Sequence, residues 1–272
     1  MIRNITSVFV LAALLIACSK NVLTGKKQFT LLPESELQAM TTTEYQTFLS
    51  KNKVVSATTN RDAEMVKRAG NRIIKAVEEH YAELGISDKL AGFKWEVNLV
   101  EDKTVNAWCM PGGKIVVYTG ILPITQNEAA LAAVMGHEVS HALLQHGNQR
   151  MSQVLMATVG QAALAVVVAN KPRETQNLFL NAYGVGATVG VLLPFSRKHE
   201  LEADKWGLIF TARAGYNPQE AIGLWERMEK AGDGQKPPEF LSTHPSEGRR
   251  IEKLKQMMPE ALKYYKPMGT GK

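Results

Sequence analysis

Two histidines four residues apart, with a glutamate directly after the first, are the residues best placed to do chemistry. They are His137 and His141, with Glu138 between them. On a helix, residues four apart share a face, so both imidazoles can bind one metal ion. Glu138 lies beside that face, where it could take a proton from a metal-activated water. This spacing is typical of zinc-dependent peptidases and predicts such a site.

A catalytic zinc needs a third protein ligand, and the position of that ligand separates the known types of site. A third histidine with a preceding glycine is absent after His141, because Gly147 and Leu144 hold those positions. A glutamate further along is also absent, because Gly160 and Gln161 occupy that region. Two types of metallopeptidase are therefore excluded.

A helix predicted at 197–214 offers the third ligand instead. Glu200 and Asp204 are four residues apart and share a face of this helix. Glu200 can complete the zinc ligands, and Asp204 can accept a hydrogen bond from the far nitrogen of a ligand histidine. Glu202 is the alternative ligand, and a solvated acidic face is the alternative interpretation of all three carboxylates.

The helix that carries the two histidines is predicted to be buried, because the residues of 129–134 are largely apolar helix formers. Thr125 and Glu128 fit a capping box at its start, and Gly147 is expected to end it. Buried polar groups without partners cost about 1–3 kcal/mol each. A metal ion would satisfy the three polar side chains of the motif.

A change of hydrophobic period predicts a small sheet just before this helix. Apolar residues alternate with polar ones from Phe93 to Leu99, which predicts a strand. Residues 105–110 and 114–119 are two further strands joined by a turn at 111–113, so the sheet is expected to be mainly antiparallel. Helices are expected at about 33–50, 61–84, 197–214, 217–230 and 246–258.

Two further apolar segments, 154–169 and 182–195, are shorter than the roughly twenty residues of a membrane span. We interpret them as buried or membrane-facing helices of the same domain, with true membrane spans as the alternative.

The N-terminus has the features of a secretion signal in the usual order. Arg3 precedes an apolar run at 8–16, and the sequence Leu-Ile-Ala-Cys that ends at Cys18 resembles a lipobox, whose cysteine is lipidated. An ordinary signal peptide or an uncleaved anchor is the alternative. We expect a signal peptide at 1–17, a lipidated N-terminus and tether at 18–32, a zinc metallopeptidase domain at 33–260 and a tail at 261–272.

Composition adds little about partners. Of 272 residues, 45% are hydrophobic and 21% are charged, which suits a folded globular chain of net charge +6. No basic run is interleaved with aromatic residues, so nucleic acid is not an expected partner. If Cys18 is lipidated, Cys109 has no disulfide partner, and we expect it to be a buried apolar residue.

Several short stretches together resemble the M48 family of zinc metallopeptidases, a gluzincin group. The resemblance implies a mainly helical α+β gluzincin domain with a small sheet and two zinc-binding helices. It also implies one zinc ion per chain held by His137, His141 and Glu200, with Glu138 as the general base. The stretches that carry it are Val22 to Phe29, Asn106 to Trp108 with Pro111 to Lys114, the histidine motif, Glu200 with Asp204, Thr243 to Pro245, and Arg250 with Ile251.

The same resemblance suggests roles for residues outside the motif. The strand Asn106, Ala107, Trp108 and Cys109 would pair with an extended substrate beside the metal, although an ordinary half-buried strand is the alternative. His244 and Arg250 would either stabilise the oxyanion of the reaction, or His244 would approach the zinc and block it at rest. A surface turn with a solvated arginine is the alternative for this last pair.

These features together predict a zinc-dependent endopeptidase, and the family resemblance implies that it acts on misfolded or unassembled proteins of a cell envelope. By resemblance to enterobacterial lipoproteins, Ser19 after the predicted lipidated cysteine favours the outer membrane of a bacterium, with the domain facing the periplasm. The alternative is a lipid-anchored, zinc-bearing chaperone or scaffold protein that does not cleave its partners.

Overall fold

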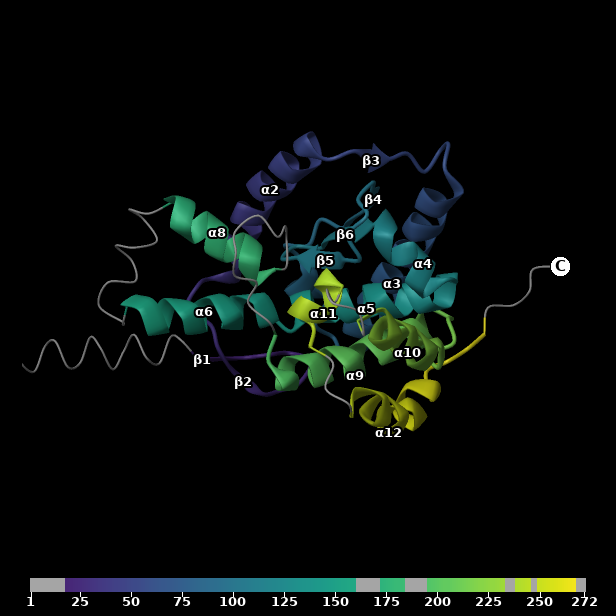
Figure 1. The fold of residues 1–272 in the computed structure, drawn as a ribbon. Coiled ribbons are helices and arrows are strands. Elements are labelled where there is room, and N and C mark those ends of the chain that lie inside the picture. Colours follow the sequence, from purple (N-terminus) through teal and green to yellow (C-terminus); the bar gives the residue numbers. More distant parts are fainter. Residues whose placement is uncertain (1–17, 160–171, 184–194, 233–237, 246–248, 268–272) are drawn as a thin grey trace, which may run out of the picture.

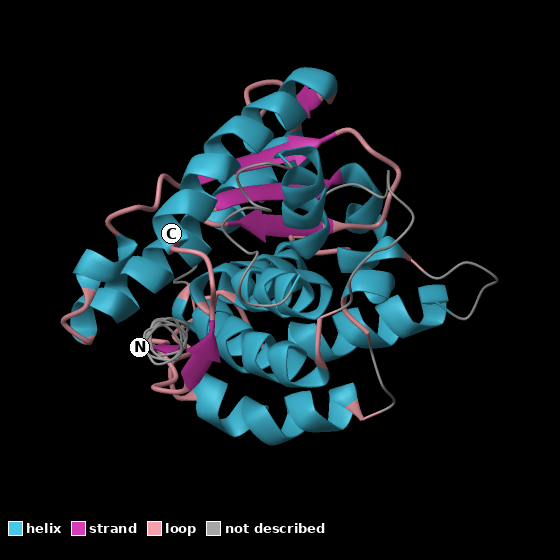
Figure 2. Cartoon of the chain, turned by 90° about the vertical axis from the view of Figure 1, so that its left-hand side faces the viewer, coloured by secondary structure: helices cyan, strands magenta, loops and turns pink. Residues whose placement is uncertain are grey.

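A four-stranded mixed sheet forms one layer of the protein, and helices cover both of its faces (Figures 1 and 2). The computed structural model describes residues 18–159, 172–183, 195–232, 238–245 and 249–267. The strand order is β3-β4-β6-β5, in which β4 and β6 are parallel and the other two pairings are antiparallel. The strands are β3 (Val54–Val55), β4 (Glu96–Val100), β5 (Ala107–Met110) and β6 (Lys114–Tyr118).

Strands β5 and β6 are buried along their whole length and are mostly apolar. Alternate side chains point to opposite faces. Val97, Cys109 and Ile115 belong to the core shared with the central helices, whereas Trp108 and Val116 belong to a second core on the other face.

Helix α5 (Glu128–Leu143) is central to the fold and packs against β5, α3, α9 and α10.

The prediction of a mainly helical domain with a small sheet is confirmed. The other helices are α2 (Glu34–Lys51), α3 (Arg61–Glu83), α4 (Leu122–Thr125), α6 (His146–Val159), α8 (Pro172–Ala182), α9 (Arg197–Arg213), α10 (Glu220–Gly232), α11 (Glu239–Thr243) and α12 (Arg250–Leu262), with short 3-10 helices at Ser87–Leu90 and Thr119–Ile121.

Both predicted ends of the central helix are wrong. Thr125 ends the short helix α4, and Asn127 is the N-cap of α5, where its side-chain oxygen accepts from Ala130 N at 2.8 Å. The helix stops at Leu143 because Gln145 adopts a left-handed conformation with φ 55°. The predicted stop, Gly147, lies inside α6.

The segment predicted to be a tether contains an antiparallel hairpin of β1 (Cys18–Lys20) and β2 (Lys27–Phe29). It lies against the C-terminal end of α5, where the last carbonyl groups of the helix need donors. Asn21 Nδ2 donates to Leu143 O at 3.0 Å, and Gln28 Nε2 donates to Leu144 O at 2.5 Å. These hydrogen bonds fix the segment to the domain.

Within the described ranges, no helix combines the length and the hydropathy that a membrane crossing requires. The parts of the two apolar segments at 160–169 and 184–194 lie outside the described residues, as does the predicted signal peptide at 1–17.

Helices α5 and α9 touch through their backbones at two glycines. A Cβ atom at Gly207 would lie 2.9 Å from His137 N, and one at Gly136 would lie 2.9 Å from Gly207 O. No larger residue fits without separating the helices. The contact therefore sets the distance between the histidine helix and the helix that carries Glu200.

We expect Gly207→Ala to lower the free energy of unfolding by about 1–3 kcal/mol, because the added methyl group overpacks a backbone contact. Gly223→Ala on α10 is the matched control, since its Cβ would meet only the end of the Arg227 side chain. That variant should be unchanged or up to about 1 kcal/mol more stable. Denaturant unfolding of both variants measures the difference. Equal stabilities would contradict the conclusion that α5 and α9 are in close backbone contact at Gly207.

Candidate metal centre

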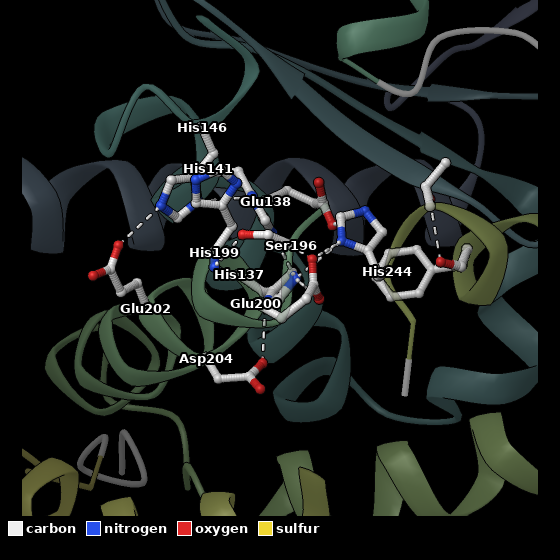
Figure 3. A network of polar contacts seen from close by, with 12 residues as sticks. His137, Glu138, His141, His146, Ser196, His199, Glu200, Glu202, Asp204 and His244 are labelled. Atoms are coloured by element: carbon white, nitrogen blue, oxygen red, sulfur yellow. Dashed lines mark hydrogen bonds and ion pairs between the residues drawn. The ribbon is translucent and has the colours of Figure 1, made fainter. Parts of the chain in front are cut away.

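The close packing of α5 and α9 brings His137, His141 and Glu200 together in the interior (Figure 3). His141 Nε2 lies 3.0 Å from His137 Nε2. The two carboxylate oxygens of Glu200 lie 3.5 Å from His137 Nε2 and 3.4 Å from His141 Nε2. All three side chains are buried.

His244, which directly follows α11, enters the same cluster. Its Nδ1 lies 3.3 Å from His137 Nε2 and 3.1 Å from Glu200 Oε1. One ligand atom from each of His137, His141, Glu200 and His244 lies within 4.8 Å of the others. The structure thus places His244 beside the predicted zinc ligands.

This set of donors fits a zinc ion. Zinc favours tetrahedral sites built from imidazole nitrogens and carboxylate oxygens. The Nε2 atoms of His137 and His141 face each other at 3.0 Å, and a shared cation would satisfy both lone pairs. His137, His141 and Glu200 would hold the ion, and His244 stands where a fourth ligand would lie.

Asp204 and Arg250 surround the ligands with a second set of buried charges. Asp204 Oδ1 accepts a hydrogen bond from His137 Nδ1 at 3.0 Å, which leaves Nε2 of that ring free for a metal. Arg250 donates to Asp204 at 2.6 and 2.9 Å and forms an ion pair with Glu200 at 2.9 Å. Its guanidinium group stacks on the ring of Trp225, with 3.4 Å to the ring centroid. Arg250 is therefore directed at two carboxylates of the site.

The pKa values of the three buried carboxylates of the site are shifted in different directions. Burial raises the pKa of Glu200, but His244 and Arg250 outweigh burial and hold that pKa well below its usual range. Burial raises the pKa of Asp204 as well, and Arg250 again brings it below the ordinary value. Burial raises the pKa of Glu138, and the nearby cations do not reverse the shift. Glu138 thus binds a proton more readily than the other two.

Glu138 lies close to His244, on the helix that packs against strand β5. Its Oε1 has no hydrogen-bond partner among the described residues, and His244 Nε2 is 3.5 Å from it. Its negative charge adds to burial in raising the pKa of Cys109 on β5. Cys109 is buried and free, as expected from the sequence.

The strand that the sequence predicted for substrate binding is an edge strand. Ala107, Trp108 and Cys109 are all buried, and β5 pairs on one side with β6. At the start of this strand, Val105 O accepts a hydrogen bond from Phe240 N of α11 at 3.1 Å. Asn106 Nδ2 donates to Glu239 Oε1 at 2.9 Å. Helix α11 therefore lies beside this end of β5.

Sequence reasoning missed His146, although it lies only five residues after His141. Its ring is fully buried, and its Nδ1 is 3.0 Å from His141 Nδ1. Glu202, the alternative third ligand, contacts His146 and not the ligand cluster. The sequence does show a third histidine soon after the motif. A continuous helix would place it on a different face from His137 and His141, so the spacing alone does not indicate a contact.

Comparison with known proteins identifies the class. A model of peptidase family M48 matches residues 67–258. The chain belongs to peptidase family M48, as the sequence motifs had suggested. The matched region lies within the predicted peptidase domain at 33–260, whose outer boundaries stay predictions.

Individual relatives include the mitochondrial metalloendopeptidase OMA1 of Schizosaccharomyces pombe, 38% identical over 70% of this chain and 52% of its own. The human metalloendopeptidase OMA1, mitochondrial, is 34% identical over 90% of this chain and 45% of its own. A beta-barrel assembly-enhancing protease of Yersinia pestis is 28% identical over 59% of this chain. The chain spans about half the length of the OMA1 proteins or less.

The predicted location at a bacterial outer membrane, facing the periplasm, is wrong. The relatives that match two thirds or more of this chain at 34% identity or above are named as mitochondrial proteins. The prediction depended on a short N-terminal pattern, and such a pattern reports on a targeting signal and not on the folded domain that the relatives share.

We expect Glu200→Gln to weaken zinc binding by more than about 100-fold. Loss of a residue that only hydrogen-bonds to a ligand costs up to about 100-fold, and loss of a ligand itself should cost more. Loss of a charged ligand explains the size of the effect. Glu202→Gln, a matched change on the same helix, should weaken binding less, because Glu202 contacts His146 and not the ligand cluster. Competition with a chromophoric chelator measures both. A larger loss in Glu202→Gln would assign the ligand to that residue instead.

Proposed function

We propose that this protein is a zinc-dependent endopeptidase. The observation that carries the proposal is the position of Glu138, a buried carboxylate of raised pKa beside the ligand cluster. A general base must lie within reach of the proton that it removes and have a pKa near the working pH. Glu138 lies beside the predicted ligands, and burial shifts its pKa upward, which is the direction that a general base requires.

A zinc ion held by His137, His141 and Glu200 would supply a Lewis acid for the peptide carbonyl and for a water molecule. Glu138 accepts the proton of the attacking water and later donates it to the leaving amine. Asp204 keeps the proton of His137 on Nδ1. Arg250 keeps Glu200 and Asp204 ionised, so it acts on the site through these two carboxylates.

Strand β5 is the surface on which we place the substrate. An extended peptide that pairs with an edge strand is held by main-chain hydrogen bonds, and β5 lies next to Glu138. Such pairing suits unfolded segments of any sequence. We therefore infer that the substrates are misfolded or unassembled proteins. Membrane attachment through a lipid on Cys18 is a part of the proposal that the sequence alone supports.

His244 stands in the way of such a substrate. It contacts two ligands and Glu138 at once, and α11 holds it beside the start of β5. We infer that His244 and α11 must withdraw before a peptide reaches the metal. This makes the conformation described here a resting one.

We expect Glu138→Gln to bind zinc with unchanged stoichiometry and to cleave an unfolded protein at least about 100-fold more slowly, because its amide cannot accept the proton. Glu96→Gln on β4 is a control outside the site and should retain activity. Activity is followed by fluorescence release from a labelled casein. Near-native activity of the Glu138 variant would refute the proposed mechanism.

We expect His244→Ala to retain zinc on its three remaining ligands and to cleave a short peptide several-fold faster, since the fourth position is freed. Zinc content and kcat/KM are measured on the same preparation. A slower enzyme with full zinc content would show that His244 stabilises the reaction and does not block the site.

A further inference from the structure

A break between α5 and α6 places His146 against a predicted metal ligand. In a continuous helix, five residues turn the side chain by about 140° relative to the starting face. Gln145 interrupts the helix with φ 55°, a conformation that costs a non-glycine residue about 1–2 kcal/mol. The result is that His146 Nδ1 lies 3.0 Å from His141 Nδ1 (Figure 3).

The directions of the hydrogen bonds follow from the role of His141. Its Nε2 faces His137 and Glu200, so this atom carries the lone pair for a metal. The ring proton is then on Nδ1, and it can only be donated to His146 Nδ1. His146 in turn carries its proton on Nε2, which points to Glu202 Oε2 at 3.4 Å.

Glu202 ends this chain at the surface of the domain. Its other oxygen accepts from Lys26 Nζ at 2.6 Å, and the Lys26 side chain is 56% exposed. Both predicted ligand histidines are therefore linked through Nδ1 to a carboxylate. His137 donates directly to a carboxylate, that of Asp204, and His141 donates to a carboxylate through one intervening imidazole.

The N-terminal hairpin is built to present Lys26. Asn21 Oδ1 accepts from the backbone nitrogens of Leu23 and Thr24 at 3.0 and 3.2 Å. Thr24 Oγ1 accepts from Lys26 N at 3.2 Å, and Gly25 adopts φ 64°, which favours glycine. These turn contacts give the stretch that begins at Val22 a structural role. The predicted zinc ligands and the general base alone do not explain that stretch.

We propose that His146, Glu202 and Lys26 form a positioning relay, which holds His141 in the tautomer and orientation that bind the metal. The relay extends the metal centre to the N-terminal hairpin, outside the residues matched by the family at 67–258. It rests on the zinc site of the proposed function. His146 touches neither substrate nor metal, so it acts only through His141.

The test measures zinc affinity and the visible spectrum of the cobalt-substituted protein. We expect His146→Phe, which keeps a ring but no nitrogen, to weaken zinc binding about 10–100-fold and to shift the cobalt bands. His146→Asn keeps a polar acceptor next to His141 and should recover most of the affinity. His199→Phe is the matched control, because its ring stacks on His146 at 4.3 Å without contacting a ligand, and it should bind as the wild type does.

Two milder variants test the relay where the fold is not at risk. Glu202→Gln removes the final carboxylate, and we expect a loss of affinity between those of the Asn and Phe variants. Lys26→Met removes a partly exposed ion pair, and we expect a loss of up to about fivefold. Thermal unfolding of the metal-free proteins shows whether each variant is folded.

The outcomes separate this proposal from the one on which it depends. If the wild type binds no zinc, the proposed function fails. If the wild type binds zinc and folded His146→Phe and Glu202→Gln bind it within about threefold of the wild type with unchanged cobalt spectra, only the relay is refuted. If His146→Phe does not fold, the Glu202 and Lys26 variants decide the question by the same measurements.

Discussion

The ion pairs of Arg250 with Asp204 and Glu200 are the interaction on which the rest of the site depends. Two buried carboxylates beside two histidines would be costly, because each ion loses its hydration. The planar guanidinium reaches both carboxylates at once and rests on the face of Trp225. Asp204 thereby stays ionised and fixes the tautomer of His137, and Glu200 stays a charged ligand.

The same arrangement leaves Glu138 outside the ion pairs. Its pKa stays raised because burial outweighs the opposing charges of His244, His137 and Arg250, whereas the pKa values of Glu200 and Asp204 are lowered. Neighbouring carboxylates with opposite pKa shifts have distinct chemical roles. In the proposed mechanism, Glu200 binds the metal, Asp204 orients His137, and Glu138 accepts the proton.

The central part of this arrangement could be predicted from the sequence, because it depends on local spacing. His137 with His141, and Glu200 with Asp204, are pairs four residues apart on helices, and helical periodicity alone puts each pair on one face. The pattern of apolar residues also identified β4, β5 and β6. The order of the strands could not be predicted from this pattern, because β6 lies between β4 and β5 and pairs with β4 in parallel.

Other features could not be predicted because they depend on tertiary contacts or on single backbone angles. Asn127 outcompetes Thr125 as the N-cap because α4 uses Thr125 in its own last turn. The left-handed Gln145 has no signal in its residue type, since glutamine is not a residue that favours this conformation. A continuous helix would turn His146 away from the motif, so its contact with His141 follows only from the break.

The N-terminal hairpin shows how far a metal centre can extend beyond its ligands. Its side chains satisfy the last carbonyl groups of α5, so the hairpin fixes the end of the helix that carries His141. Through Glu202 it also reaches the imidazole that faces His141. Both contacts act on the same ligand, one through the backbone and one through the side chain. The segment that the sequence predicts to be a tether is therefore placed to influence the geometry of one half of the proposed site.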